Sequence, residues 1–129
     1  MQDLLRGDDR RVASVLIVDD DEDIRSALAE LLADEGHAVC EAVDGEDAFA
    51  TLCAMPTLPT LVLLDMMMPR MNGNEFLDAI ARVPRLAALP VVVVSAYAGS
   101  VRSGARRVMA KPINPAALLQ VVEEIRGHA

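Results

Sequence analysis

Three runs of consecutive apolar residues constrain the fold of this chain more than any other feature. They are VLIV at 15–18, LVLL at 61–64 and VVVV at 91–94, and a polar side chain follows each run at once. A strand with one solvated face alternates apolar and polar residues, whereas a strand buried on both faces is a continuous apolar run. The three runs therefore predict the centre of a parallel sheet that helices cover on both sides.

Helix-like segments separate the predicted strands along the chain. We predict strands at 12–18, 38–42, 60–65, 91–96 and 106–111, and helices at 21–36, 45–54, 72–83 and 114–127. Gly36 is a stop signal for the first helix, and Asn114 followed by Pro115 is typical of a helix start. The order predicts a single doubly wound α/β domain at 12–127, preceded by a loose tail at 1–11.

The composition fits a folded, acidic domain. The chain has 129 residues, is 53% hydrophobic and carries a net charge of −8. No apolar run approaches the ~20 residues that a membrane span needs, and the first residues lack the apolar core of a signal peptide. We therefore expect a cytoplasmic location without membrane contact. The negative charge would repel a phosphate backbone, so we expect no direct binding of nucleic acid.

Other reactive or charged residues carry no functional signal. Cys40 and Cys53 lack metal-ligand spacing, and we expect small buried thiols. His37 and His128 stand in polar sequence surroundings, for which we predict exposure and no catalytic role. The arginines near 102–107 are best explained as a solvated face.

The polar residues that follow the strands carry the functional signal. Asp19 and Asp20 follow the first predicted strand, Asp65 the third, Ser95 the fourth and Lys111 the fifth. Because the carboxyl ends of parallel strands meet at one edge of the sheet, these side chains are expected to converge there.

Carboxylates that converge in this way would repel one another by roughly 3 kcal/mol per pair at an effective dielectric constant of about 20. A hard divalent cation such as Mg²⁺, together with the lysine, would offset this repulsion. A carboxylate nucleophile, a cation and donors for phosphate oxygens are the parts of a phosphoryl-transfer site. Each part also has an ordinary structural explanation: acids at 21–23 suit a helix N-terminus, and the methionines at 66–68 suit core packing.

Four blocks of the sequence together resemble the signature blocks of bacterial response-regulator receiver domains. The blocks are VLIVDDDEDIR, LVLLDMMMPRMNG, PVVVVSA and VMAKPI. The resemblance covers roughly residues 12–126 and implies a flavodoxin-like sheet of order 2-1-3-4-5. It implies that Asp19, Asp20 and Asp65 bind Mg²⁺ and that the backbone carbonyl of Met67 completes the metal site.

The same resemblance assigns the phosphoryl chemistry. Asp65 matches the phospho-acceptor, Ser95 the hydroxyl that bonds a phosphate oxygen, and Lys111 the lysine that pairs with phosphate. In the family the bond from this lysine to the next residue, here Pro112, is cis. The implied partners are a sensor histidine kinase or phosphotransfer protein as donor and an unknown downstream protein as target. The domain would catalyse its own phosphorylation and dephosphorylation while acting as a switch.

Two departures from the family pattern fall between the fourth and fifth strands. Ser95 and Lys111 are sixteen positions apart, and this separation is shorter than is usual in receiver domains. The shortage falls on 97–105, where we predict a short or irregular fourth helix. Val108 replaces the usual switch aromatic, and Tyr97 is the nearest aromatic hydroxyl that could partly substitute for it. We therefore expect intact phosphorylation chemistry and an altered output surface.

Alternatives remain at this point. A phosphatase of the haloacid-dehalogenase type also uses a strand-end aspartate, but it needs a second acid where this chain has Met67. A binding module that kept the pocket and works without phosphate is another. The sequence also leaves open whether the domain stands alone or was cut from a longer regulator or hybrid kinase.

Overall fold

Five parallel strands form one sheet at the centre of the molecule. The computed structural model describes residues 13–68, 70–96 and 104–127. The strands pair in the order β2-β1-β3-β4-β5, which confirms the predicted topology. They are β1 (Ser14–Val18), β2 (Ala38–Ala42), β3 (Leu61–Asp65), β4 (Val91–Ser95) and β5 (Arg107–Ala110).

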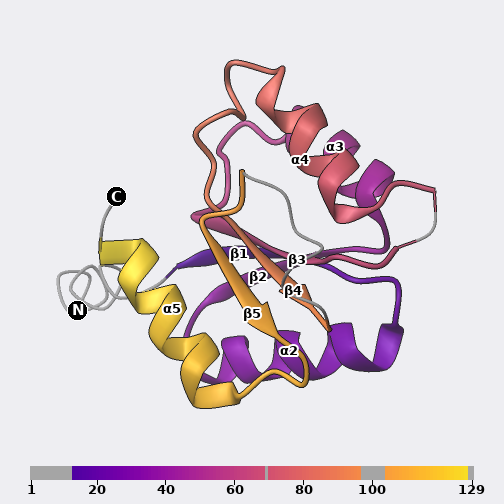
Figure 1. Ribbon diagram of the computed structural model, residues 1–129. Coiled ribbons are helices and arrows are strands. Elements are labelled where there is room, and N and C mark those ends of the chain that lie inside the picture. Colours follow the sequence, from indigo (N-terminus) through magenta and orange to yellow (C-terminus); the bar gives the residue numbers. More distant parts are fainter. Residues whose placement is uncertain (1–12, 69, 97–103, 128–129) are drawn as a thin grey trace, which may run out of the picture.

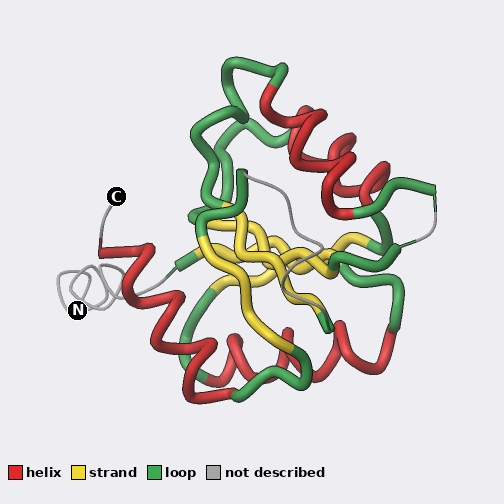
Figure 2. Tube along the Cα trace, viewed as in Figure 1, coloured by secondary structure: helices red, strands yellow, loops and turns green. Residues whose placement is uncertain are grey.

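Helices cover both faces of this sheet, as the apolar runs predicted. The helices of the described residues are α2 (Glu22–Asp34), α3 (Gly45–Ala54), α4 (Gly73–Ala81) and α5 (Pro115–Gly127). Figures 1 and 2 show α3 and α4 together on one side of the sheet, and α2 and α5 on the other. Every predicted boundary of these helices and strands lies within two residues of the observed one.

Alternating residues of the central strands build two separate cores. In β3, Val62 and Leu64 pack with the α3 and α4 residues, while Leu61 and Leu63 pack with the α2 and α5 residues. All four of these side chains are at most 2% exposed. At about 1.5–3 kcal/mol for each fully buried aliphatic side chain, this packing on both faces is the main stabilising contribution to the sheet.

Polar side chains cap the helices at the sheet edge where the strands end. Asp21 accepts hydrogen bonds from the N–H groups of Asp23 and Ile24 at the start of α2. Asn72 forms a reciprocal capping box with Glu75 at the start of α4. Asn114 accepts from the N–H of Ala117, which confirms the predicted start of α5. All of these helix N-termini point to the same edge, where the functional residues were expected.

The structure corrects two predictions about exposure. His37 is only 7% exposed rather than solvated, and its Nδ1 accepts a hydrogen bond of 2.9 Å from the N–H of Ala13. The cysteines are not buried thiols, since Cys40 is half-buried and Cys53 is exposed. Cys40 lies on β2, an edge strand of the sheet, and Cys53 near the end of α3, where neither is enclosed.

The predicted short or irregular fourth helix falls mainly on 97–103, outside the described residues, as does Tyr97. Gly104 and Ala105, which follow this segment, are not helical, and Gly104 has a positive φ of 119°. Across the described ranges, no helix combines the length and the apolar character required to cross a bilayer.

The hydrogen bond between His37 and Ala13 gives a prediction about stability. Replacing His37→Leu leaves the buried Ala13 N–H without an acceptor and should lower the free energy of unfolding by about 1–3 kcal/mol. His37→Asn is the matched control, because its side-chain oxygen is an acceptor close to the position of Nδ1. Urea denaturation should show a clearly smaller loss for the asparagine variant; equal losses would mean that packing, and not this bond, makes His37 important.

Candidate functional site

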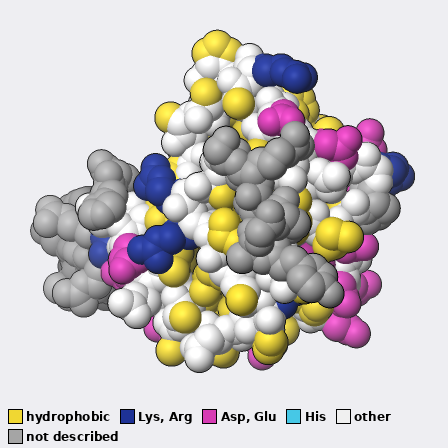
Figure 3. Space-filling model, viewed as in Figure 1, with side chains coloured by type: hydrophobic (Ala, Val, Ile, Leu, Met, Phe, Trp, Pro, Cys, Tyr) yellow, Lys and Arg dark blue, Asp and Glu magenta, His cyan; other side chains and the backbone are white. Residues whose placement is uncertain are grey.

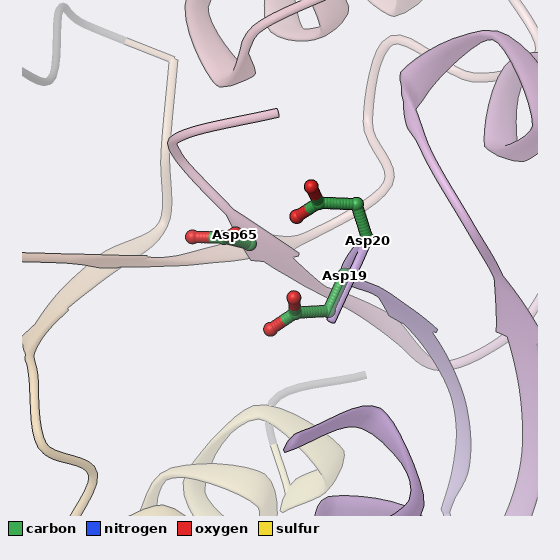
Figure 4. Close-up of side chains that lie close together, drawn as sticks. All are labelled: Asp19, Asp20 and Asp65. Atoms are coloured by element: carbon green, nitrogen blue, oxygen red, sulfur yellow. The ribbon is translucent and has the colours of Figure 1, made fainter. Parts of the chain in front are cut away.

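Three aspartates from two neighbouring strands meet at the carboxyl edge of the sheet. Asp19 and Asp20 directly follow β1, and Asp65 is the last residue of β3, which pairs with β1. One carboxylate oxygen from each lies within 4.8 Å of the others. Figure 4 shows the three carboxylates directed toward one shared space. The structure thus brings together the three acids that the order of the strands predicted to converge.

Burial makes this group of acids electrostatically unfavourable by itself. Asp19 is 4% exposed and Asp65 is 5% exposed, whereas Asp20 is open to solvent. Burial raises the pKa of Asp19, the N–H of Asp21 opposes that shift, and the charges of Asp65 and Asp20 add to it. A raised aspartate pKa means that the site resists its own negative charge.

Lys111 supplies a positive charge from the far side of the site. Its Nζ lies 2.8 Å from Asp65 Oδ1. Burial alone would lower the pKa of Lys111, but the hydrogen bond and charge of Asp65, with the charges of Asp19 and Asp20, raise it overall. The ammonium therefore stays protonated, and three carboxylates with one ammonium leave excess negative charge in the site. The Lys111–Pro112 peptide bond is cis, as the resemblance implied.

Ser95 and Met67 flank Asp65 in different ways. Ser95 ends β4, is 2% exposed, and lies one residue beyond Val94, the register partner of Asp65. Its carbonyl accepts the N–H of Lys111 at 3.0 Å. Met67 turns its side chain to solvent and donates its N–H to Asp65 Oδ1 at 3.3 Å. Met66 and Met68 are buried, as predicted for packing methionines, and only Met67 of the three is not.

The donors of this site fit a hard divalent cation. The cluster offers only carboxylate oxygens, and its repulsion of roughly 3 kcal/mol per pair is the kind that Mg²⁺ relieves. Figure 3 shows acidic side chains gathered on the same side of the molecule, at the right of the view, where β1 and β3 end.

An apolar cavity of about 490 Å³ opens beside the acids. Asp19, Asp65 and Lys111 line its polar end. The remaining lining is apolar and comes from the sheet, from α2 and from the segment after β5: Ile17, Val18, Ile24, Ala27, Leu28, Leu63, Val94, Pro112 and Ile113. Ile24 is 40% exposed although it is a large apolar residue.

The sequence did not single out two arginines that hold the loops of the site. Arg25 donates to the carbonyl of Asp19 at 2.7 Å and to Glu41 at 2.9 Å. Arg70 pairs with the buried Asp44. For Arg25, the position four residues after the cap Asp21 was a usable signal, because a side chain in the first helical turn can reach back to the loop before the helix. For Arg70 the place in a turn was the available signal, because its partner Asp44 is 26 residues away.

Comparison with known proteins now decides the family. A family model described as "Response regulator receiver domain" matches residues 15–123. The chain belongs to this family. Receiver domains are the response-regulator component of two-component signalling, and they accept a phosphoryl group from a kinase. They generally bind Mg²⁺ at an acidic pocket, and they interact with histidine kinases and downstream effectors. This membership sets aside the phosphatase alternative.

Individual relatives agree with the assignment. This receiver domain is 30% identical to Protein PilH of Pseudomonas aeruginosa, over 88% of this chain and 98% of PilH. It is 34% identical to the transcriptional regulatory protein CpxR of Escherichia coli, over 88% of this chain but only 50% of CpxR. A crystal structure of a CheY-like receiver domain protein from Methanospirillum hungatei superposes with a TM-score of 0.80 at 28% identity, covering 91% and 95% of the two chains.

The electrostatics of this receiver domain predict that removing one acid stabilises it without metal. Asp19→Asn keeps the oxygen that accepts the N–H of Asp21 and removes a charge that repels Asp65 and Asp20. We expect thermal unfolding at pH 7 to shift up by about 4 °C, or about 1 kcal/mol.

The pH dependence of this gain has a definite sign. Because the pKa of Asp19 is raised, the wild-type protein loses stability as the pH rises through that pKa. The gain from Asp19→Asn should therefore vanish below the ordinary aspartate pKa of 3.8. Thermal unfolding followed by circular dichroism at several pH values tests this, and a destabilised variant at pH 7 would contradict it.

Proposed function

We propose that the chain is a phospho-acceptor switch whose nucleophile is Asp65. Asp19, Asp20 and Asp65, with the carbonyl of Met67, would hold Mg²⁺. The observation that carries this proposal is the cluster of three carboxylate oxygens within 4.8 Å of one another. The ion pair between Lys111 and Asp65 also supports the proposal, because an ammonium beside the nucleophile can pair with an incoming phosphate group.

The reaction follows from the position of Asp65. One carboxylate oxygen of Asp65 attacks the phosphorus of a phosphohistidine on the donor protein. The phosphorus–nitrogen bond breaks, its electron pair returns to the imidazole, and an acyl phosphate remains on Asp65. Bound Mg²⁺ supplies charge neutralisation for the carboxylates and the transferred group. Lys111 has to exchange part of its contact with Asp65 for a phosphate oxygen.

Ser95 and Lys111 would then report the new state to the rest of the domain. The Ser95 hydroxyl and the Lys111 ammonium both gain a phosphate oxygen as a partner, which favours the conformation in which they lie closest to it. Val108, 41% exposed on β5, replaces the usual aromatic switch residue. The output therefore depends on the backbone of β4 and β5 rather than on rotation of a ring at that position. We expect this exchange to take place in the cytoplasm.

Covalent labelling tests this function directly. Incubation with acetyl phosphate and Mg²⁺ should add the mass of one phosphoryl group to the intact protein, and EDTA should prevent the addition. Asp65→Asn should abolish it, because the amide is not a nucleophile, while Ser95→Ala should still be labelled. A wild-type protein that binds Mg²⁺ but takes up no phosphoryl group would favour a binding module that works without phosphate.

The apolar cavity beside the acids suggests how a protein donor is recognised. Ile24 and Leu28 of α2 and Ile113 after β5 line the same cavity as Asp65. Apolar side chains of a donor helix would bury themselves here and bring its phosphohistidine to the nucleophile. A sensor histidine kinase or phosphotransfer protein has this form of donor surface.

This docking hypothesis separates two kinds of phosphoryl donor. Ile24→Ala should slow transfer from an autophosphorylated kinase that labels the wild type by roughly 5- to 10-fold, since about 1 kcal/mol of interface burial is lost. Labelling by acetyl phosphate should stay within about twofold, because a small donor does not use the groove. Val108→Ala, a similarly exposed apolar residue on β5, is the control. Equal slowing with both donors would mean that Ile24 affects the chemistry and not docking.

A further inference from the structure

The loop between β3 and α4 is tied to the neighbouring corner of the fold by one arginine. Arg70 donates through its guanidinium to Asp44 Oδ2, and its Nε lies 3.4 Å from Glu46 Oε1. Asp44 is the N-cap of α3 and its side chain is 5% exposed, while 68% of the Arg70 side chain is exposed. A surface cation thus reaches across to a buried carboxylate on a different element.

Both oxygens of the Asp44 carboxylate accept a hydrogen bond in this arrangement. Its Oδ1 accepts the N–H of Asp47 at 2.8 Å, and its other oxygen accepts from Arg70. The N–H of Asp47 and the guanidinium of Arg70 lower the pKa of Asp44. Loss of Arg70 would therefore leave the Asp44 carboxylate with its backbone partners at the start of α3 and would open it to water, because the guanidinium that covers it is itself exposed.

Arg70 occupies a backbone conformation that glycine adopts more easily than arginine does. Its φ is 68°, in the left-handed region where a residue with a Cβ is less stable than glycine by about 1 kcal/mol. The loop also packs closely against the start of α3, since a Cβ on Gly45 would lie 2.9 Å from the side chain of Met71. The chain therefore keeps an unfavourable residue at a turn position, and the ion pair with Asp44 is the interaction that offsets this disadvantage.

The tied loop is the one that carries the proposed metal ligand. Met66 is fixed at both of its backbone groups: its N–H donates to Val94 and its carbonyl accepts from Gly73, each at 3.0 Å. Met67 follows, and its N–H donates to the side chain of Asp65 at 3.3 Å while its own side chain points to solvent. Among the described contacts of the residues between Met67 and Gly73, the ion pairs of Arg70 with Asp44 and Glu46 connect this loop to the start of α3.

We propose that Arg70 is a positioning residue for the metal site, acting through Asp44 to hold the 66–73 loop so that the Met67 carbonyl faces the three aspartates. This role rests on the proposed function. Arg70 touches neither the aspartates nor the transferred phosphoryl group. Its contribution should therefore appear in the affinity for Mg²⁺ and not in the rate at saturating Mg²⁺.

The decisive variant is Arg70→Gly, because glycine removes the ion pair and the left-handed strain together. Its midpoint in urea should stay close to that of the wild type, while the dissociation constant for Mg²⁺ in calorimetry rises roughly 10-fold, as for other residues that orient a metal ligand. Labelling by acetyl phosphate should slow at limiting Mg²⁺ and recover at saturating Mg²⁺. Arg70→Lys, which keeps the charge but not the two-pronged geometry, should lie between the two.

Asp44→Asn is the matched change on the other side of the pair. Asparagine keeps the cap on α3, so helix stability is retained while the charge that holds Arg70 is lost. Combined with Arg70→Gly it should weaken Mg²⁺ binding no further than either change alone, because both remove the same interaction.

Two results would overturn the proposal for Arg70. One is a Mg²⁺ dissociation constant in Arg70→Gly within about twofold of the wild type; the other is a fully additive double variant. A wild-type chain that neither binds Mg²⁺ nor takes up a phosphoryl group would instead overturn the proposed function, so the two failures are distinguishable.

Discussion

The repulsion among Asp19, Asp20 and Asp65 is the constraint on which the rest of the site depends. A sheet buried on both faces places the ends of its central strands in an environment with little water, where like charges interact strongly. Asp65 ends a strand whose preceding four residues are at most 2% exposed. Contacts from neighbouring elements offset the burial of this carboxylate, and the ion pair with Lys111 at 2.8 Å is one of them.

The helices contribute to the same electrostatic balance. In a doubly wound fold each helix begins just beyond the carboxyl end of a strand, so α2, α3, α4 and α5 direct the positive ends of their dipoles to this edge. Asp21 and Asp44 use part of that field as N-caps. The fold therefore provides the cluster with a partly favourable potential before any metal is bound, while burial, with a smaller contribution from the charges of Asp65 and Asp20, still raises the pKa of Asp19.

Local pattern was sufficient to predict most of the fold, because apolar runs and helix caps are properties of adjacent residues. The runs at 15–18, 61–64 and 91–94 became buried strands, and the convergence of three acids followed from parallel topology alone. The burial of His37 was not predictable in this way, since its partner Ala13 lies 24 residues earlier.

Arg70 illustrates the same limit within the site. Its residue type suggests a solvated side chain, and most of that side chain is indeed exposed. Its importance appears only when Asp44 is brought beside it by the packing of α3 against α4. Polar contacts between distant segments are the part of a site that composition and periodicity do not encode.

A backbone hydrogen bond joins Ser95 and Lys111, the two residues proposed to sense phosphate. Lys111 donates its N–H to the carbonyl of Ser95, at the point where the β4–β5 ladder ends. A shift of the backbone at this point of the ladder would therefore move both residues together. β5 is an edge strand of the sheet, and Arg107, Val108 and Ala110 on it are exposed. Since few atoms cover this strand, a shift in the ladder alters the surface that a partner meets, even without an aromatic switch residue at position 108.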